Sequence, residues 1–175
     1  MCVCRSPTYT RDYDNKAQIT CVAVHPNQVE LISGDQNGSI KIWDLQANLC
    51  AHELVPDEGV AIRSLSVAAD GSMLVAGNNK GDVYVWRMDN SRDATSFRPL
   101  SVINAHKKNV LKCLLSPDIR LLATTSADHT VKIWNTQKFT LEKTLTGHQR
   151  WVWDCAFSAD SAYLVTGTVA RLFHL

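Results

Sequence analysis

The sequence predicts an all-β chain built from repeated four-stranded units, the blades of a β-propeller. Three segments around a tryptophan, at residues 32–45, 75–88 and 125–136, align without a gap. Each has a short apolar strand, a turn rich in Gly, Asn and Asp, and an alternating strand that ends in the tryptophan, which is the pattern of a β-hairpin. Another strand and turn precede each segment, and helical periodicity is weak. The repeat tryptophans, spaced 43 and 48 residues apart, are Trp43, Trp86 and Trp134.

The innermost strand of each unit comes first in its repeat. These strands begin at Ile19, Ile62, Val110 and Val152. The fourth unit differs, because after YLVTG the expected turn and tryptophan-ending strand are replaced by TVARLFHL, with Phe173 at the tryptophan position. We therefore expect a partial propeller of three full blades and a truncated fourth. The predicted units are an N-terminal segment at 1–18, either an outer strand or disordered, blades at 19–61, 62–105 and 106–147, and the truncated blade at 148–175.

Dipeptides at fixed places in the repeat carry a resemblance to a known family. They are Ala105-His106, Gly147-His148, Trp43-Asp44, and the degenerate Trp86-Arg87 and Trp134-Asn135. On these motifs and the repeat, the chain from residue 19 on resembles the WD-repeat family. The resemblance implies a structural hydrogen-bond network in the third unit. Its members would be His106, Ser126, Asp128 and Trp134.

In this network the carboxylate accepts a hydrogen bond from the imidazole, whose other nitrogen pairs with the hydroxyl, and the hydroxyl reaches the indole N–H. Each partly buried polar group thereby gains a partner. The first and second units carry Asn37 and Lys80 at the position of Asp128, and neither has the Gly-His pair. We expect packing to hold those two blades.

Composition excludes several classes of partner. The formal net charge is +1, and no basic stripe suited to nucleic acid or to an anionic membrane is present. No apolar run approaches the roughly 20 residues of a membrane span. We expect a soluble, cytoplasmic protein that neither binds nucleic acid nor inserts into a membrane.

The six cysteines do not predict a metal site. Cys2 and Cys4 form a C-x-C pair with no second pair at ligand spacing. One position in each innermost strand, counted back from the turn that ends the strand, forms a repeat column that is predicted to lie in the apolar core. That column holds Val22, Leu65, Cys113 and Cys155.

No catalytic constellation stands out. A glycine-rich phosphate loop and a Gly-x-Ser-x-Gly elbow are both missing from the sequence. The histidines occupy repeat positions, turns or variable stretches, where structural or solvent-facing roles explain them. We expect a protein that is not an enzyme and needs no cofactor.

Two tryptophans lie two positions apart in the stretch GHQRWVWDCAFSADS. On a strand, Trp151 and Trp153 share one face and Val152 takes the other. Either the indoles pack between neighbouring blades, or they reach the rim and present a flat amphipathic surface to a partner. Tryptophan is among the residues most enriched at interface hot spots.

A narrower resemblance favours the partner-binding alternative. HPNQVELISGDQNGSIKIWDL, LKCLLSPD, SADHTVKIWN and LTGHQRWVWDCAFS resemble the small WD-repeat (G-protein β-subunit-like) subunits of the TOR (target of rapamycin) kinase complex, especially the plant versions. That resemblance implies the middle and C-terminal part of a seven-bladed, non-catalytic scaffold in nutrient and growth signalling. Such a scaffold docks on the kinase catalytic domain, stabilises it, associates with the other subunits and follows the complex to endosomal or other endomembranes. The candidate partner-binding residues are Arg150, Trp151 and Trp153.

Two alternatives stay open. The first is a substrate receptor of a cullin-type ubiquitin ligase; such receptors tend to carry an arginine two residues after the Trp-Asp pair. Gln46 and Gln137 hold those positions here, which argues against it. The second is a truncated, non-functional variant that cannot close its ring.

Overall fold

The computed structural model describes residues 17–90 and 95–168, and within them the chain forms β-strands, turns and loops without a helix. The first sheet consists of β1 (Ile19–Val24), β2 (Glu30–Asp35), β3 (Ile40–Asp44) and β4 (Leu49–Leu54). The second consists of β5 (Ile62–Val67), β6 (Met73–Asn78), β7 (Asp82–Asn90) and β8 (Thr95–Asn104). The third consists of β9 (Val110–Leu115), β10 (Leu121–Ser126), β11 (Val131–Asn135) and β12 (Leu141–Leu145). The fourth consists of β13 (Val152–Phe157) and β14 (Leu164–Thr168).

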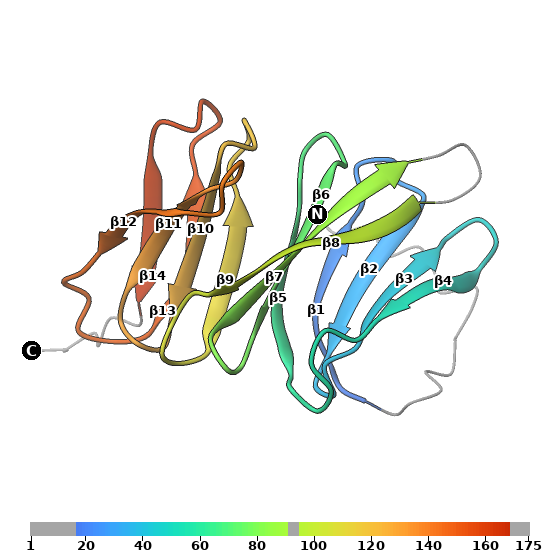
Figure 1. Cartoon of the computed structure of the whole chain (residues 1–175), viewed down its shortest axis with the longest axis horizontal. Coiled ribbons are helices and arrows are strands. Elements are labelled where there is room, and N and C mark those ends of the chain that lie inside the picture. Colours follow the sequence, from blue (N-terminus) through green and yellow to red (C-terminus); the bar gives the residue numbers. More distant parts are fainter. Residues whose placement is uncertain (1–16, 91–94, 169–175) are drawn as a thin grey trace, which may run out of the picture.

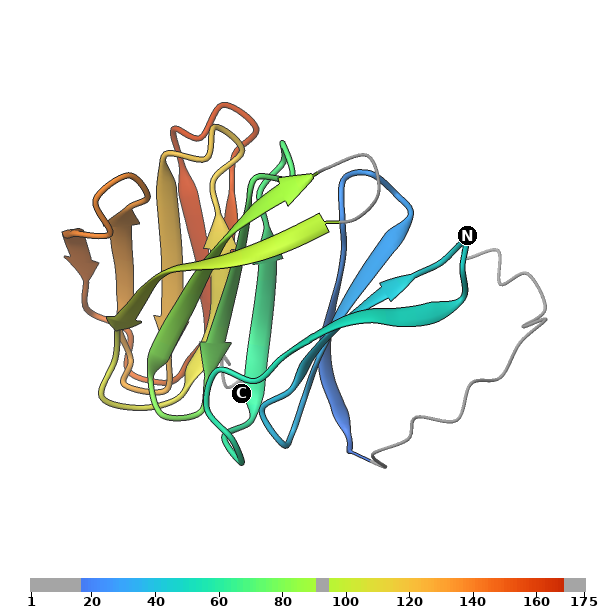
Figure 2. The same cartoon turned by 45° about the vertical axis from the view of Figure 1, so that its right-hand side comes forward.

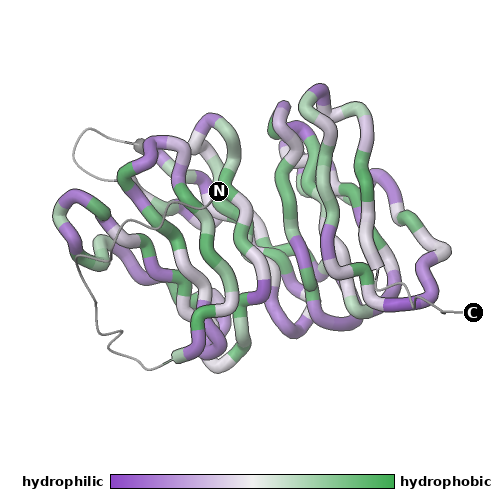
Figure 3. Tube along the Cα trace, turned by 180° about the vertical axis from the view of Figure 1, so that it is seen from behind, coloured by the Kyte–Doolittle hydropathy of each residue, from purple (hydrophilic) through white to green (hydrophobic). Residues whose placement is uncertain are grey.

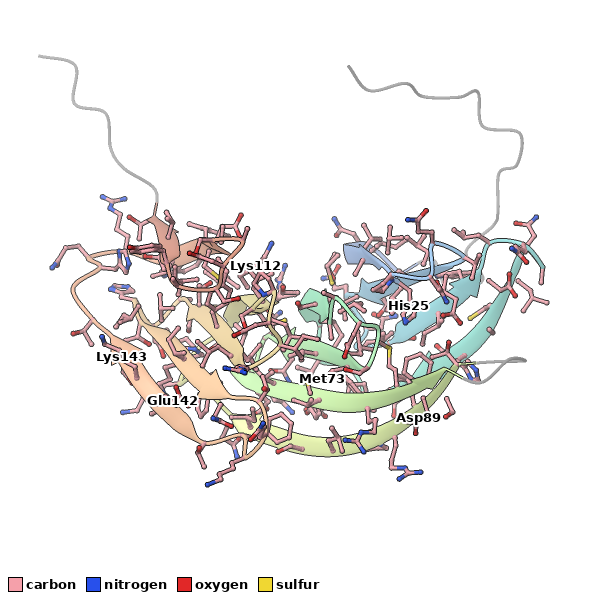
Figure 4. All side chains as sticks on the ribbon, turned by 90° about the horizontal axis from the view of Figure 1, so that it is seen from above. His25, Met73, Asp89, Lys112, Glu142 and Lys143 are labelled. Carbon is pink, nitrogen blue, oxygen red and sulfur yellow. The ribbon has the colours of Figure 1, made fainter. Side chains whose placement is uncertain are left out.

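The sheets are antiparallel meanders that follow one another in an arc (Figure 1). Turning the molecule shows them packed face to face in chain order (Figure 2). Lys112 on β9 lies on the concave side, whereas Glu142 and Lys143 on β12 lie on the convex side (Figure 4). Within the described residues, the predicted all-β partial propeller is confirmed, with three four-stranded sheets and a fourth sheet of two strands.

The strand register shows that the repeat tryptophans are equivalent. Each pairs with a leucine on the preceding strand, and a register shift directly precedes each one. The pairs are Leu31–Trp43, Leu74–Trp86 and Leu122–Trp134. The gapless alignment in the sequence therefore corresponds to one position repeated in three sheets.

Apolar side chains between successive sheets form the core. The cluster between the first two sheets joins isoleucines of β2 and β3 to the tryptophan face of the second sheet, and its members include Ile32, Ile40, Ile42, Ile62, Leu74 and Trp86. The cluster between the second and third sheets includes Val75, Val83, Val85, Val110, Cys113 and Trp134. The hydropathy trace places apolar residues along the strands and polar residues in many of the loops (Figure 3). The tryptophan faces of the second and third sheets thus pack on the sheet that precedes each of them.

The predicted core column is buried at three of its four positions. Leu65, Cys113 and Cys155 are 9%, 0% and 6% exposed. Val22 is 60% exposed, so its prediction as a core residue is wrong. Its face is the one that receives a preceding sheet elsewhere in the repeat, and no sheet precedes β1 among the described residues.

The buried cysteines behave as small apolar groups. Burial raises the pKa of the Cys113 thiol and of the Cys155 thiol to about 12, which removes their reactivity at neutral pH. Cys2, Cys4, Phe173 and most of the segment 1–18 lie outside the described residues.

Candidate partner-binding surface

The two adjacent tryptophans lie at the start of β13, the innermost strand of the fourth sheet. Trp151 and Trp153 are 44% and 48% exposed, and Val152 between them is fully buried. The two indole rings lean on each other, with centroids 5.5 Å apart and planes tilted by 48°. The alternation of a strand therefore turns both indoles outward and the valine toward the third sheet.

A shallow hollow of about 510 Å³ adjoins the indoles on one side. It is lined by His129, Gln149, Arg150 and the two tryptophans. Arg150 is exposed, so the hollow combines flat aromatic surface with a guanidinium group that is always charged. Sequence reasoning grouped this arginine with the indoles but missed His129, which comes from the β10–β11 turn.

A second hollow of about 240 Å³ lies along the innermost strands. Thr20, Arg63, Leu111 and Trp153 hold the same register position on β1, β5, β9 and β13, and all four line it. The indoles are therefore part of the inner wall of the arc, near the end at which the innermost strands begin. The sequence was sufficient to identify these neighbours of Trp153, because Thr20, Arg63 and Leu111 hold the same position in their repeats.

The residue types at this surface are those common at protein interfaces. Exposed tryptophans next to an arginine are the residue types that dominate hot spots at protein interfaces. Among residues 17–90 and 95–168, no group of three or more His, Cys, Asp or Glu side chains is arranged to hold a metal ion.

The third sheet holds a buried chain of hydrogen bonds. The indole N–H of Trp134 donates to Thr124 Oγ1 at 3.0 Å, and Thr124 Oγ1 lies 2.8 Å from His106 Nε2. His106 Nδ1 lies 2.9 Å from Asp128 Oδ2. Three of the four predicted members are thus connected, through a hydroxyl that the sequence reading did not select.

The prediction that Ser126 supplies this hydroxyl is wrong. Ser126 ends β10 opposite Val110, two residues beyond Thr124, and its hydroxyl serves the turn. It accepts the backbone N–H of Asp128 at 3.0 Å and donates to the carbonyl of Lys108 at 3.3 Å. The repeat alignment could have indicated Thr124, because the equivalent position also carries a hydroxyl in the first unit, at Ser33, and in the fourth, at Thr166.

Burial sets the protonation state of this chain. It lowers the pKa of His106 below the usual 6.5, and this outweighs the opposing effect of the Asp128 carboxylate. The pKa of Asp128 is lowered as well, because hydrogen bonds from Thr130 and His106 outweigh its partial burial, which acts to raise it. A neutral imidazole then donates from Nδ1 to Asp128 and accepts the Thr124 hydroxyl at Nε2, a tautomer assigned from the hydrogen-bond pattern.

The other units keep parts of the network. Trp43 donates to Ser33 Oγ at 2.9 Å in the first sheet, and His148 Nε2 lies 2.9 Å from Thr166 Oγ1 in the fourth. The second sheet has alanine at the hydroxyl position, and its Trp86 stacks on Tyr84 with centroids 6.0 Å apart. Packing therefore replaces hydrogen bonding there.

Comparison with known proteins assigns the repeat to a family. The WD40 family pattern (WD domain, G-beta repeat) matches residues 5–44, 97–135 and 139–170. The chain belongs to the WD40 repeat family. The later two matches begin on the outer strand of one sheet and run into the next, and β5, β6 and β7 lie outside all three. This WD40 chain thus forms a complete second sheet although three of its strands lie outside the matched residues.

Two relatives are similar to this WD40 chain over most of its length. One is "Target of rapamycin complex subunit wat1" of Schizosaccharomyces pombe, 53% identical over 81% of this chain and 46% of the relative. The other is "Non-functional target of rapamycin complex subunit LST8-2" of Arabidopsis thaliana, 55% identical over 86% of this chain and 49% of the relative. The predicted likeness to small WD-repeat TOR complex subunits is confirmed, although these two identities do not separate plant from fungal versions. The chain spans about half the length of the relatives it matches.

Similarity to solved structures supports the fold alone. The structure of U3-55K superposes with a TM-score of 0.70 at 23% identity, over 78% of this chain and 42% of that one. No helix in the described part of the chain has the length and apolar character needed to cross a bilayer.

Proposed function

We propose that this chain is part of a small WD-repeat subunit of the TOR kinase complex and acts as a non-catalytic scaffold. The support is a pair of relatives, named as TOR complex subunits, whose identity of 53–55% extends over more than four fifths of the chain. As a scaffold it would bind the kinase catalytic domain, stabilise it, contact the associated subunits and follow the complex to endosomal or other endomembranes.

The surface proposed to bind the kinase domain is formed by Arg150, Trp151 and Trp153. The observation that carries this proposal is the exposure of two adjacent indoles, 44% and 48%, on a strand whose intervening valine is fully buried. Indoles that pack between sheets, such as Trp86 and Trp134, are only 5% and 6% exposed. The exposed pair supplies aromatic area and two N–H donors to a partner at little cost in side-chain entropy.

The test is co-elution of the 175-residue chain with a TOR kinase-domain fragment in size-exclusion chromatography. The double variant Trp151→Ala/Trp153→Ala should lose co-elution while remaining folded by circular dichroism. The matched control is Leu100→Ala/Val102→Ala, a pair with the same spacing on β8, 39% and 59% exposed. Equal co-elution of the tryptophan variant and the control would refute the assignment of this surface.

A second candidate is a variant that does not support the kinase. It is favoured by the printed name of the Arabidopsis relative, which calls that protein non-functional. Failure of the unmodified, folded chain to co-elute with the kinase fragment would support this candidate.

The cullin-receptor alternative has no comparable support. In the pairs Trp43-Asp44 and Trp134-Asn135, the second residue closes a local turn. Asp44 Oδ1 accepts the N–H groups of Gln46 and Ala47, and Asn135 Oδ1 accepts those of Gln137 and Lys138.

A further inference from the structure

Each innermost strand carries a β-bulge at its second residue. The pairing of β1, β5, β9 and β13 with the next strand skips one residue there, which is the pattern of a bulge. A bulged residue has no partner across the ladder, and the bulge re-aims its side chain. The four bulged residues all line the hollow of about 240 Å³ on the inner wall, and they are Thr20, Arg63, Leu111 and Trp153.

The bulges separate this wall from the core between the sheets. In β5, β9 and β13 the residue before the bulge is a β-branched aliphatic one, and Ile62, Val110 and Val152 are 1%, 0% and 0% exposed. The bulged positions that follow carry a guanidinium group, an isobutyl group and an indole. Core packing therefore fixes the first position of each strand, while the chemistry of the second position differs from sheet to sheet and is presented on the inner wall.

The two exposed indoles connect this hollow with the one beside Arg150. Trp151 and Trp153 line both hollows, and each hollow contains one arginine, Arg150 in the first and Arg63 in the second. Both arginines are exposed, and Arg63 Nε donates to Asn79 Oδ1 at 2.6 Å. No salt bridge within residues 17–90 and 95–168 involves either arginine, and none of the described residues that line the two hollows is acidic. The surface thus combines shared aromatic area with two cationic groups that lack an anionic partner in the described part of the chain.

We propose that the occupant of these two hollows is an extended protein segment with acidic side chains on both sides of an apolar one. The proposal builds on the proposed function, which assigns the indole pair to a partner, and adds the chemistry of the segment that is bound. The apolar side chain would lie against the indoles, and the acidic ones would pair with Arg63 and Arg150, because a planar guanidinium group binds a carboxylate through two hydrogen bonds. A single-stranded nucleic acid would need a basic groove that follows its backbone, and the net charge of +1 does not favour one.

The test is selection from a random peptide library displayed on phage, with the unmodified 175-residue chain as the target. We expect the enriched peptides to carry aspartate or glutamate on both sides of an apolar residue. The dissociation constant of an enriched, fluorescein-labelled peptide should rise about tenfold or more in Arg63→Ala, because a hydrogen bond between charged groups is lost, and further in Arg63→Glu. Arg98→Ala is the matched control, since it removes an exposed arginine of β8 outside both hollows and should leave the constant unchanged. Circular dichroism checks that each variant is folded.

Several outcomes would overturn the proposal. They are a selection that enriches no peptide, enriched peptides without acidic residues, and peptides that bind Arg63→Ala as tightly as the unmodified chain. Tighter binding of a labelled single-stranded DNA than of the peptides, weakened by Arg63→Ala, would assign the wall to nucleic acid instead.

The peptide measurements do not depend on the kinase, so the two proposals fail separately. A chain that binds acidic peptides through Arg63 but does not co-elute with the kinase fragment would count against the proposed function alone. A chain that co-elutes normally but enriches no acidic peptide would count against this inference alone.

Discussion

Replacing Thr124 with valine should destabilise the third sheet, because one buried hydroxyl joins two aromatic side chains. Thr124 Oγ1 accepts the Trp134 indole N–H at 3.0 Å and lies 2.8 Å from His106 Nε2. Valine keeps the volume but removes both hydrogen bonds. A net contribution of ~1 kcal/mol per hydrogen bond, and ~1–3 kcal/mol for a buried group left unpaired, predict a loss of ~2–4 kcal/mol in the free energy of unfolding.

The assay is equilibrium urea unfolding followed by tryptophan fluorescence, with Ser126→Ala as the comparison. Ser126 is buried as well, but its hydroxyl makes one accepted hydrogen bond of 3.0 Å and one longer donated bond of 3.3 Å, both to the backbone of turns, so its loss should cost ~1–2 kcal/mol, less than the loss of the Thr124 hydroxyl. In thermal unfolding the valine variant should melt about 5–15 °C below the unmodified chain. If Thr124→Val proves no more destabilising than Ser126→Ala, the assignment of the network hydroxyl to Thr124 is refuted.

Three further predictions follow from burial and packing. Burial lowers the pKa of His106 below 6.5, so as the pH drops the unfolded chain takes up a proton before the folded chain does. The free energy of unfolding should therefore decrease as the pH drops below about 6.5, and it should decrease less in His106→Gln. Urea unfolding at a series of pH values measures both. Gly77→Ala should cost ~1–3 kcal/mol through overpacking, whereas Gly167→Ala, at an open position, should stay within ~0.5 kcal/mol in the same assay. In a Cys2→Ser/Cys4→Ser chain, a thiol reagent should modify the exposed Cys50 under native conditions and the buried thiols only in denaturant, and rapid native labelling of every cysteine would contradict the packing.

The sequence alone was enough to predict the repeated hairpins, because each blade is formed by strands that are close together in the chain. The spacing of the tryptophans and the turn residues between strands determine each hairpin, and the register then makes Trp43, Trp86 and Trp134 equivalent. Strand alternation also predicted that Val152 would turn away from the two indoles beside it.

Burial was harder to predict, because it depends on a neighbouring sheet and not on the residue itself. Val22 and Cys113 hold the same register position, but only Cys113 has a preceding sheet to cover it among the described residues. The choice of Ser126 failed for a different reason. Two hydroxyl-bearing residues two positions apart share a strand face, so periodicity alone does not distinguish Thr124 from Ser126.

The exposure of the tryptophan pair is what makes the kinase-binding experiment interpretable. Burial stabilises side chains that are 44–48% exposed less than it stabilises Trp86 and Trp134, which are 5% and 6% exposed, and the contact between the two rings adds only ~0.5–1.5 kcal/mol. Truncating one of the exposed indoles should therefore cost less folding free energy than truncating Trp86 or Trp134. A hot-spot residue, in contrast, costs ~2 kcal/mol or more in binding when it is truncated. If Trp151→Ala or Trp153→Ala lost as much folding stability as Trp86→Ala and Trp134→Ala, the indoles would belong to the core of the fourth sheet, and the reasoning that assigns them to a partner would fail.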